Sequence, residues 1–106
     1  MEKNIPEHNI SQILEVERLF HEPARIAILS LLYVVESADF LFIMNQTGLT
    51  QGNLSSHLNK LEESSVIEVI KSFAGKRPRT TIKLTAEGRL RFKNYVDSVK
   101  DFFGSL

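Results

Sequence analysis

Cysteine is absent from the 106-residue sequence, and glycine and proline are scarce, with five and three residues respectively. A chain without a thiol can form no disulfide, no thiolate metal site and no cysteine nucleophile, and we expect it to work in the reducing cytoplasm. The few glycines and prolines leave no obvious interdomain linker. Because the length is typical of one domain, the sequence predicts a single, modest core.

Long apolar runs are also missing. No segment approaches the roughly 18 consecutive apolar residues that a membrane-spanning helix needs. No apolar stretch follows the first residues, 1–4, so we expect no signal peptide. The sequence therefore predicts neither a membrane span nor a secretion signal.

Motifs for catalysis and cofactor binding are absent as well. The sequence contains no phosphate-binding loop, no dinucleotide-binding glycine pattern, no nucleophile elbow and no zinc-protease motif. The separations between His8, His21 and His57 match no metal-ligand motif. We therefore expect no enzymatic activity, no cofactor and no metal, and we interpret His57 as a capping or phosphate contact.

The net charge of zero hides an asymmetry between the two halves of the chain. Residues 1–50 carry three basic and seven acidic side chains, whereas residues 51–106 carry ten basic and six acidic ones. The stretch 71–83 holds five lysines and arginines and no acid. This segment points to a local anionic partner, but a solvated loop that only keeps the chain soluble fits the charge equally well.

Hydrophobic spacing and capping residues predict four helices, then two strands, then a last helix. Asp39, Thr50 and Thr85 suit helix N-caps, and Gly48 can adopt the positive φ at which the third helix ends. The predicted helices are 9–20, one beginning at Pro23, 40–46, 50–63 and 85–103, and the predicted strands are 66–73 and 80–84.

The fourth predicted helix has two contrasting faces. Leu54, Leu58 and Leu61 form a narrow inward stripe, whereas the outward face is small and rich in amides. Short polar side chains on a helix are suited to read base edges in the major groove of B-DNA. The alternative is an ordinary amphipathic helix, but such a helix favours Glu–Lys pairs, and this one has none before Lys60.

Residues 74–79 are the predicted tip of a hairpin between the two strands, and Gly75 permits the turn. The tip carries Lys76, Arg77 and Arg79. Arginine inserts well into narrow minor grooves, where negative potential is concentrated. The alternative is a turn that maintains solubility and blunts an edge strand.

A family resemblance is carried by three stretches: HEPARIAILSLL, TGLTQGNLSSHLNKLEE and IEVIKSFAGKRPRTTIKLTAEGRLRF. The span 21–95 that contains them resembles winged helix-turn-helix transcriptional regulators of the MarR-like and ArsR-like type, above all a small archaeal type that ends in one long helix. The resemblance implies a mostly α-helical fold with a small β-hairpin, in which a three-helix core carries a wing. The implied parts of the single domain, 1–106, are an N-terminal dimerisation helix (1–20), a winged-helix core (21–85) and a C-terminal dimerisation helix (86–106).

The resemblance further implies a sequence-specific regulator of transcription that binds double-stranded DNA as a homodimer. In related regulators the helix that matches 50–63 enters the major groove, and the hairpin touches the minor groove or its phosphates. The DNA-binding residues expected on this basis are Thr50, Gln51, Gly52, Asn53, Ser55, Ser56, His57, Asn59, Lys60, Lys76, Arg77, Arg79 and Thr80.

Aromatic and aliphatic residues at helical spacing in the last helix predict a dimer interface, because one short chain would struggle to cover them. The alternative is that the first helix folds back over this stripe within one chain. The expected dimer contacts are Ile10, Ile13, Leu14, Phe92, Tyr95, Val96, Val99, Phe102 and Phe103. A helix-lined space at such an interface could hold a small apolar effector.

Two features depart from the family pattern. Relatives usually have glycine after the recognition helix, where this chain has Ser64 and Ser65; a serine there costs about 1 kcal/mol if the backbone geometry is kept. The third helix is unusually apolar, and Phe42 is expected near an exposed face, against the first helix or a partner. This helix and the neutral net charge support the rival hypothesis, a winged-helix module for protein–protein interaction.

Overall fold

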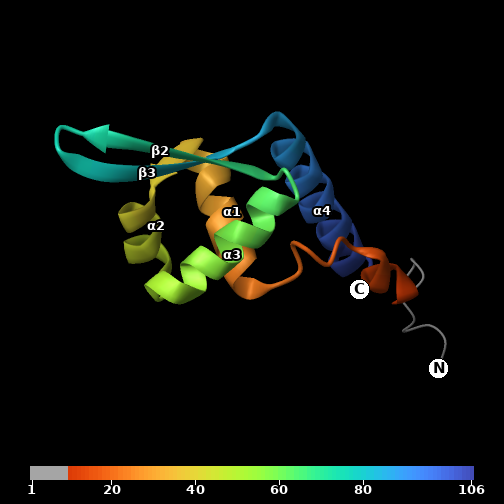
Figure 1. Cartoon of the computed structure of the whole chain (residues 1–106). Coiled ribbons are helices and arrows are strands. Elements are labelled where there is room, and N and C mark those ends of the chain that lie inside the picture. Colours follow the sequence, from red (N-terminus) through yellow and green to blue (C-terminus); the bar gives the residue numbers. More distant parts are fainter. Residues whose placement is uncertain (1–9) are drawn as a thin grey trace, which may run out of the picture.

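The structure, a computed structural model, describes residues 10–106; His8 and the rest of 1–9 lie outside this range. Helices gather on one side of a small sheet, and a long β-hairpin and a long C-terminal helix leave the core in different directions (Figure 1). The elements in chain order are the 3₁₀ helix η2 (Ile10–Glu15), α1 (Pro23–Val35), β1 (Ser37–Asp39), α2 (Phe40–Thr47), α3 (Gln51–Glu63), β2 (Ile67–Ala74), β3 (Arg77–Leu84) and α4 (Ala86–Gly104). This architecture confirms the predicted mostly helical winged helix-turn-helix fold.

Local capping explains where the four α-helices begin. The side chains of Asp39, Thr50 and Thr85 accept hydrogen bonds from backbone N–H groups in the first turns of α2, α3 and α4, as predicted. Glu22 caps α1 in the same way, which the sequence did not indicate. Gly48 ends α2 with a φ of 73°, which confirms the predicted left-handed position.

The sheet contains a strand that the sequence did not predict. The strand order is β1-β3-β2 and all pairings are antiparallel, with Ala38 opposite Ile82 in one pair and Val69 opposite Ile82 in the other. With only three residues, β1 is too short for a periodic pattern to reveal it. It forms the edge of the sheet on the side of β3 that faces away from β2.

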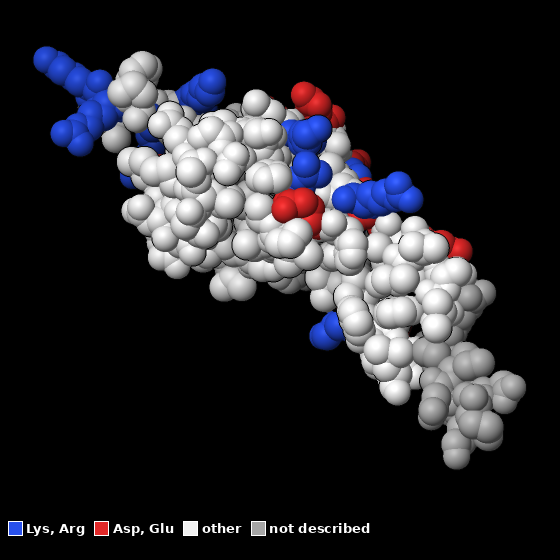
Figure 2. Space-filling view, turned by 90° about the horizontal axis from the view of Figure 1, so that it is seen from below, with Lys and Arg blue, Asp and Glu red and all other residues white. Residues whose placement is uncertain are grey.

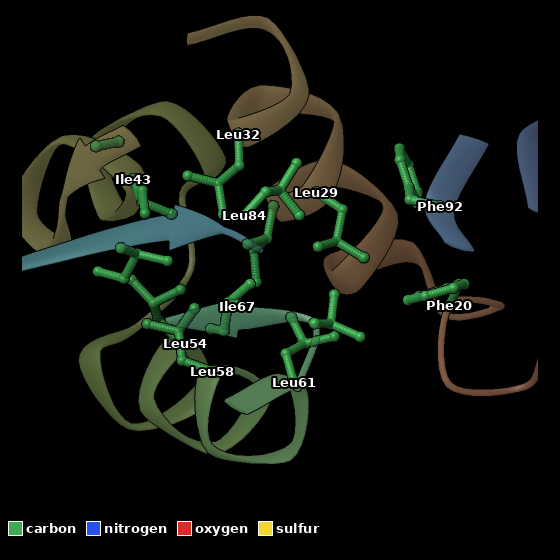
Figure 3. Packing of buried hydrophobic residues seen from close by; sticks show 14 of the residues in the cluster. Phe20, Leu29, Leu32, Ile43, Leu54, Leu58, Leu61, Ile67, Leu84 and Phe92 are labelled. Carbon is green, nitrogen blue, oxygen red and sulfur yellow. The ribbon is translucent and has the colours of Figure 1, made fainter. Parts of the chain in front are cut away.

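The hydrophobic core lies between the helices and the sheet (Figure 3). Leu54, Leu58 and Leu61 of α3 are buried, which confirms the predicted inward stripe. They meet buried side chains from the other elements around them. These include Leu29 and Leu32 of α1, Ile43 of α2, Ile67 of β2 and Leu84 of β3.

The predicted first helix, 9–20, is wrong in both type and extent. Among residues 10–20 only Ile10–Glu15 is helical, and it is a 3₁₀ helix. The chain then turns, and Phe20 is fully buried with its ring 5.8 Å from Phe92 and 5.7 Å from Tyr95. Burial of this aromatic cluster, which is distant in sequence, outweighs the local helical pattern.

The hairpin tip is narrower than the predicted 74–79. Pairing continues to Ala74 opposite Arg77, so the turn consists of Gly75 and Lys76 alone. Arg77 and Arg79 therefore belong to β3. Pro78 lies opposite Phe73 of β2, but β1 pairs with β3 only at 81–83, so the other side of β3 is an open edge at Pro78, where proline is tolerated.

The turn after α3 keeps the geometry that usually requires glycine. Ser65 has a φ of 62°. Its N–H donates to the carbonyl oxygen of Glu62, and the N–H of Val66 donates to that of Leu61, both at 3.0 Å. This is the hydrogen-bond pattern of a Schellman cap, with serine at the left-handed position.

Candidate nucleic-acid interface

The outer face of α3 is polar and open. Gln51, Gly52, Asn53, Ser56 and Asn59 are all exposed, as is Lys60. Thr50 is exposed beside them at the N-cap, and Ser55 is half-buried at the edge of this face. The helix therefore brings together the polar residues expected from its sequence, and most of their side chains remain accessible.

The hairpin projects beyond the core, and its far end is basic. Lys76, Arg77 and Arg79 are exposed, and Thr80 is half-buried where the hairpin meets the helices. In Figure 2 a cluster of basic side chains stands at one extremity of the molecule, next to a broad uncharged surface. We call the basic end of the hairpin, residues 74–79, the wing tip.

A groove with a volume of about 390 Å³ separates α3 from the hairpin strands. Gln51, Ser55 and Asn59 line its helical wall, one turn apart from each other. Lys71 and Thr80 line the opposite wall. The sequence pattern had not placed Lys71 opposite α3, although it belongs to the basic stretch 71–83, because the contact depends on how the hairpin folds back.

The basic residues of the hairpin have no acidic partner in the described part of the chain. Within residues 10–106, no carboxylate forms an ion pair with any lysine or arginine of the stretch 71–83. All five of these side chains are exposed. This segment can therefore offer its charge to an external anion without first breaking an internal bond.

His57 faces α1 and makes contacts within the chain. Its Nδ1 accepts a hydrogen bond from Nε of Arg25 at 3.0 Å and lies 3.6 Å from Oε2 of Glu22. Burial disfavours the charge of Glu22, but the N–H groups of Ala24 and Arg25 and the neighbouring His57 and Arg25 outweigh it, so the pKa of this carboxyl lies below its usual 4.5. His57 thus differs from the other expected DNA contacts on α3.

The residues expected at a dimer interface divide into two groups. Phe92 and Tyr95 are 4% and 6% exposed within the single chain, where they pack on Phe20. Phe20 follows the 3₁₀ helix, so these two positions are covered within the chain by the segment between η2 and α1 rather than by the first helix itself. The other expected contacts are exposed or half-buried: Ile10, Ile13, Leu14, Val96, Val99, Phe102 and Phe103.

The described residues give no sign of a membrane span or a metal cluster. Within 10–106, no helix combines the length and the hydropathy that crossing a bilayer demands. In the same range, no three histidine or acidic side chains gather closely enough to share a metal ion.

Comparison with known proteins finds one family model and a clear relative. Residues 24–103 match the model of the winged helix DNA-binding domain. Over 79 residues the chain is 43% identical to the uncharacterized protein MJ0432 of Methanocaldococcus jannaschii. The aligned region covers 74% of this chain and 86% of that protein.

Several solved structures share the fold. A transcriptional regulator homologue from Pyrococcus horikoshii is 29% identical, with a TM-score of 0.83 over 89% of this chain and 95% of that one. AbfR, solved in an overoxidized form bound to DNA, is 18% identical with a TM-score of 0.70 over 86% and 65% of the two chains. The ArsR family transcriptional regulator RHA00566 is 17% identical with a TM-score of 0.58 over 93% and 97%.

Proposed function

The chain belongs to the family of winged helix DNA-binding domains, and from that premise we propose that it is a homodimeric, sequence-specific regulator of transcription. The family consists of DNA-binding regulators rather than enzymes. One observation carries the proposal: an open polar face on α3 lies beside a hairpin whose basic residues are unpaired within residues 10–106. Because such a regulator acts on the chromosome, we propose that the protein works in the cytoplasm.

We place α3 in the major groove. A helix of 13 residues is roughly 20 Å long, and its diameter suits a groove about 12 Å wide. Gln51, Asn53 and Asn59 carry amides that can pair with adenine edges, and Ser56 carries a hydroxyl that suits a base or a phosphate. Gly52 adds no side chain, so the backbone can approach the DNA closely.

The strand of DNA backbone that separates a major groove from the next minor groove would run along the groove between α3 and the hairpin, past the one carboxylate in its lining, that of Glu62. Lys71 and Thr80 would face this strand from the hairpin, and Ser55 would face it from α3. Beyond the strand, the wing tip reaches the minor groove with Arg77 and Arg79. Phosphate contacts of this kind supply affinity, while contacts from α3 to base edges supply specificity.

The dimer is supported by apolar side chains left uncovered at one end of the molecule. Leu14 is 72% exposed on η2, and Phe103 and Leu106 are 58% and 76% exposed near the end of α4. Two-fold pairing through this end would present two copies of α3 to one face of DNA. Half-sites one helical turn, about 34 Å, apart are expected.

A small apolar effector is supported by a second groove, between α1 and α4. Its volume is about 350 Å³, and Tyr33, Val34, Phe92 and Val96 form most of its lining. This face lies apart from the groove between α3 and the hairpin, so a ligand there would not compete directly with DNA. Ligand binding would appear as a rise in the melting temperature at saturating ligand.

A second candidate function, a module for protein–protein interaction, is favoured by α2. Leu41 and Phe42 are 59% and 43% exposed on this short helix, so both offer apolar surface to a partner. Failure of the purified chain to bind any genomic duplex, together with a stable complex with another protein, would decide for this function.

The experiment that tests the proposed function is selection of bound fragments from a pool of random duplex DNA. The account predicts an enriched, near-palindromic site with half-sites about one turn apart. Asn59→Ala should reduce discrimination between the selected site and a mismatched one by about 1–3 kcal/mol. A matched Arg77→Ala variant should weaken binding to both duplexes alike. Recovery of no enriched sequence would refute sequence-specific reading.

A further inference from the structure

His57 joins the proposed DNA-reading helix to the start of α1. Its side chain is 21% exposed, and its Nδ1 accepts a hydrogen bond from Nε of Arg25 at 3.0 Å. The same guanidinium donates through Nη1 to the backbone carbonyl of Leu19 at 3.2 Å. Arg25 is therefore held between α3 and the segment that precedes α1.

The contact between Arg25 and His57 requires a neutral imidazole. An arginine has only donors, so Nδ1 must offer a lone pair, and the proton of the neutral ring must reside on Nε2. Protonation of Nδ1 removes this acceptor and sets two positive charges against each other. The same proton gives His57 a new partner, Oε2 of Glu22, which lies only 3.6 Å away.

Few charged groups contact His57, so the change of hydrogen-bond partner on protonation involves only its immediate neighbours. Among the described residues, the charged groups that contact His57 are Arg25 and Glu22, both at the start of α1. On α3 itself the nearest charge along the helix is Lys60, one turn further on and exposed. Glu22 stays ionised over the range in which histidine titrates, so the group of three changes from neutral to a net charge of +1 when His57 takes a proton.

We propose that His57 makes DNA binding depend on pH. Protonation of His57 releases Arg25 from the hydrogen bond at Nδ1 and adds one positive charge to α3. The added charge raises the affinity of the protein for the phosphate backbone. This inference rests on the proposed function, since His57 belongs to α3, the helix that we place in the major groove.

The test is a DNA-binding titration by fluorescence anisotropy at pH 8 and pH 5.5, with a selected duplex and an unrelated duplex of equal length. One additional neutralised phosphate should steepen the slope of log affinity against log salt by about 0.9 per subunit, and at a fixed salt concentration the affinity should be higher at pH 5.5 than at pH 8. His57→Gln should remove this pH-dependent increment. His57→Lys, which carries a permanent charge and cannot accept from Arg25, should bind at pH 8 as tightly as the parent does at pH 5.5.

Two controls isolate His57 from the other histidines. His21 contacts α4, where its Nδ1 is 2.7 Å from the hydroxyl of Tyr95, and it makes no hydrogen bond to His57, so His21→Gln should keep the parental pH profile. His8→Gln serves the same purpose for the residue outside the described range. Circular dichroism verifies that each variant is folded, and imidazole ¹⁵N shifts of the free protein report directly whether Nδ1 is unprotonated at pH 8.

The outcomes separate the two claims. A protein that binds neither duplex at any pH refutes the proposed function together with this inference. A protein that binds DNA, but whose His57→Gln variant keeps the parental pH dependence, refutes the inference alone. A protonated Nδ1 in the free protein at pH 8 also contradicts it.

Discussion

The hairpin and α4 are both rich in charge, but they use it differently. On α4, two of the four basic residues form ion pairs, Arg91 with Glu17 and Glu87 and Lys93 with Asp97. Within residues 10–106 no basic residue of the stretch 71–83 has such a partner. Charge that is satisfied internally holds the chain together, whereas unpaired charge is available to an anion outside. The difference marks the hairpin, and not α4, as the electrostatic part of the interface.

The same contrast appears in two glycines. A Cβ at Gly88, on α4, would lie 2.0 Å from the backbone oxygen of Val66, whereas a Cβ at Gly52, on α3, meets nothing within 4 Å. The first glycine is needed for packing within the chain. The second leaves open space on the face that we assign to DNA.

The largest effect is expected from Gly88→Ala. The added methyl group would collide with backbone, which cannot move as a side chain can, so the free energy of unfolding should fall by about 3 kcal/mol or more. Chemical denaturation monitored by circular dichroism measures this loss. Gly52→Ala is the matched control: it should raise stability by about 0.5 kcal/mol while weakening DNA binding. Equal stability of the two variants would contradict the contrast.

The next effect is expected from Arg91→Ala. The guanidinium donates to the carbonyl of Ser64 at 2.8 Å, pairs with Glu17 and Glu87, and stacks over the ring of Phe20 at 5.6 Å. Partial exposure limits the value of each ion pair, and we expect a loss of about 2 kcal/mol in unfolding free energy. The salt dependence of DNA binding should stay unchanged. A shallower salt slope would show that α4 contributes to the DNA contact after all.

A smaller effect, in the opposite direction, is expected from Ser65→Gly at the end of α3. Ser65 has a φ of 62°, which glycine adopts without steric cost, so the variant should be more stable by about 1 kcal/mol. Thermal unfolding measures the gain. Because Ser65 follows the reading face, DNA affinity should not change; a loss of affinity would place this turn within the interface.

The smallest effect concerns pH and Glu22, at the junction between α1 and α3. Its pKa is lower in the folded chain than its usual value, so its charge stabilises the fold above about pH 4.5, and this contribution is lost as the pH falls through the folded-state pKa. Glu22→Gln should therefore be less stable than the parent at pH 6, and the difference should shrink at pH 3. A difference that stays constant with pH would show that the carboxylate charge plays no part.

The sequence predicted best the features that neighbouring residues determine. Asp39, Thr50 and Thr85 were identified as N-caps from local chemistry alone, and the leucine stripe of α3 from its spacing. The winged-helix fold follows from the order of these elements, and both the structure and the family match confirm it.

The larger errors involve contacts between residues distant in sequence. The predicted first helix does not extend to residue 20, because Phe20 is buried against α4. The same burial covers Phe92 and Tyr95, which were expected on the exposed apolar face of α4. The short strand β1 exists only because β3 lies beside it. The sequence did not predict the partners of His57 at the start of α1 for the same reason. Each of these contacts depends on packing rather than on a local pattern.

The most direct test of the central claim, that the unpaired charges of the hairpin bind DNA phosphates, is the salt dependence of DNA affinity. The account predicts that log affinity falls linearly with log salt, with a slope of about −0.9 for each phosphate neutralised. Replacing Arg77 and Arg79 together with alanine should make this slope shallower by about 2 per subunit and leave stability nearly unchanged. An affinity that does not change with salt, or a slope that the double substitution leaves intact, would contradict the claim.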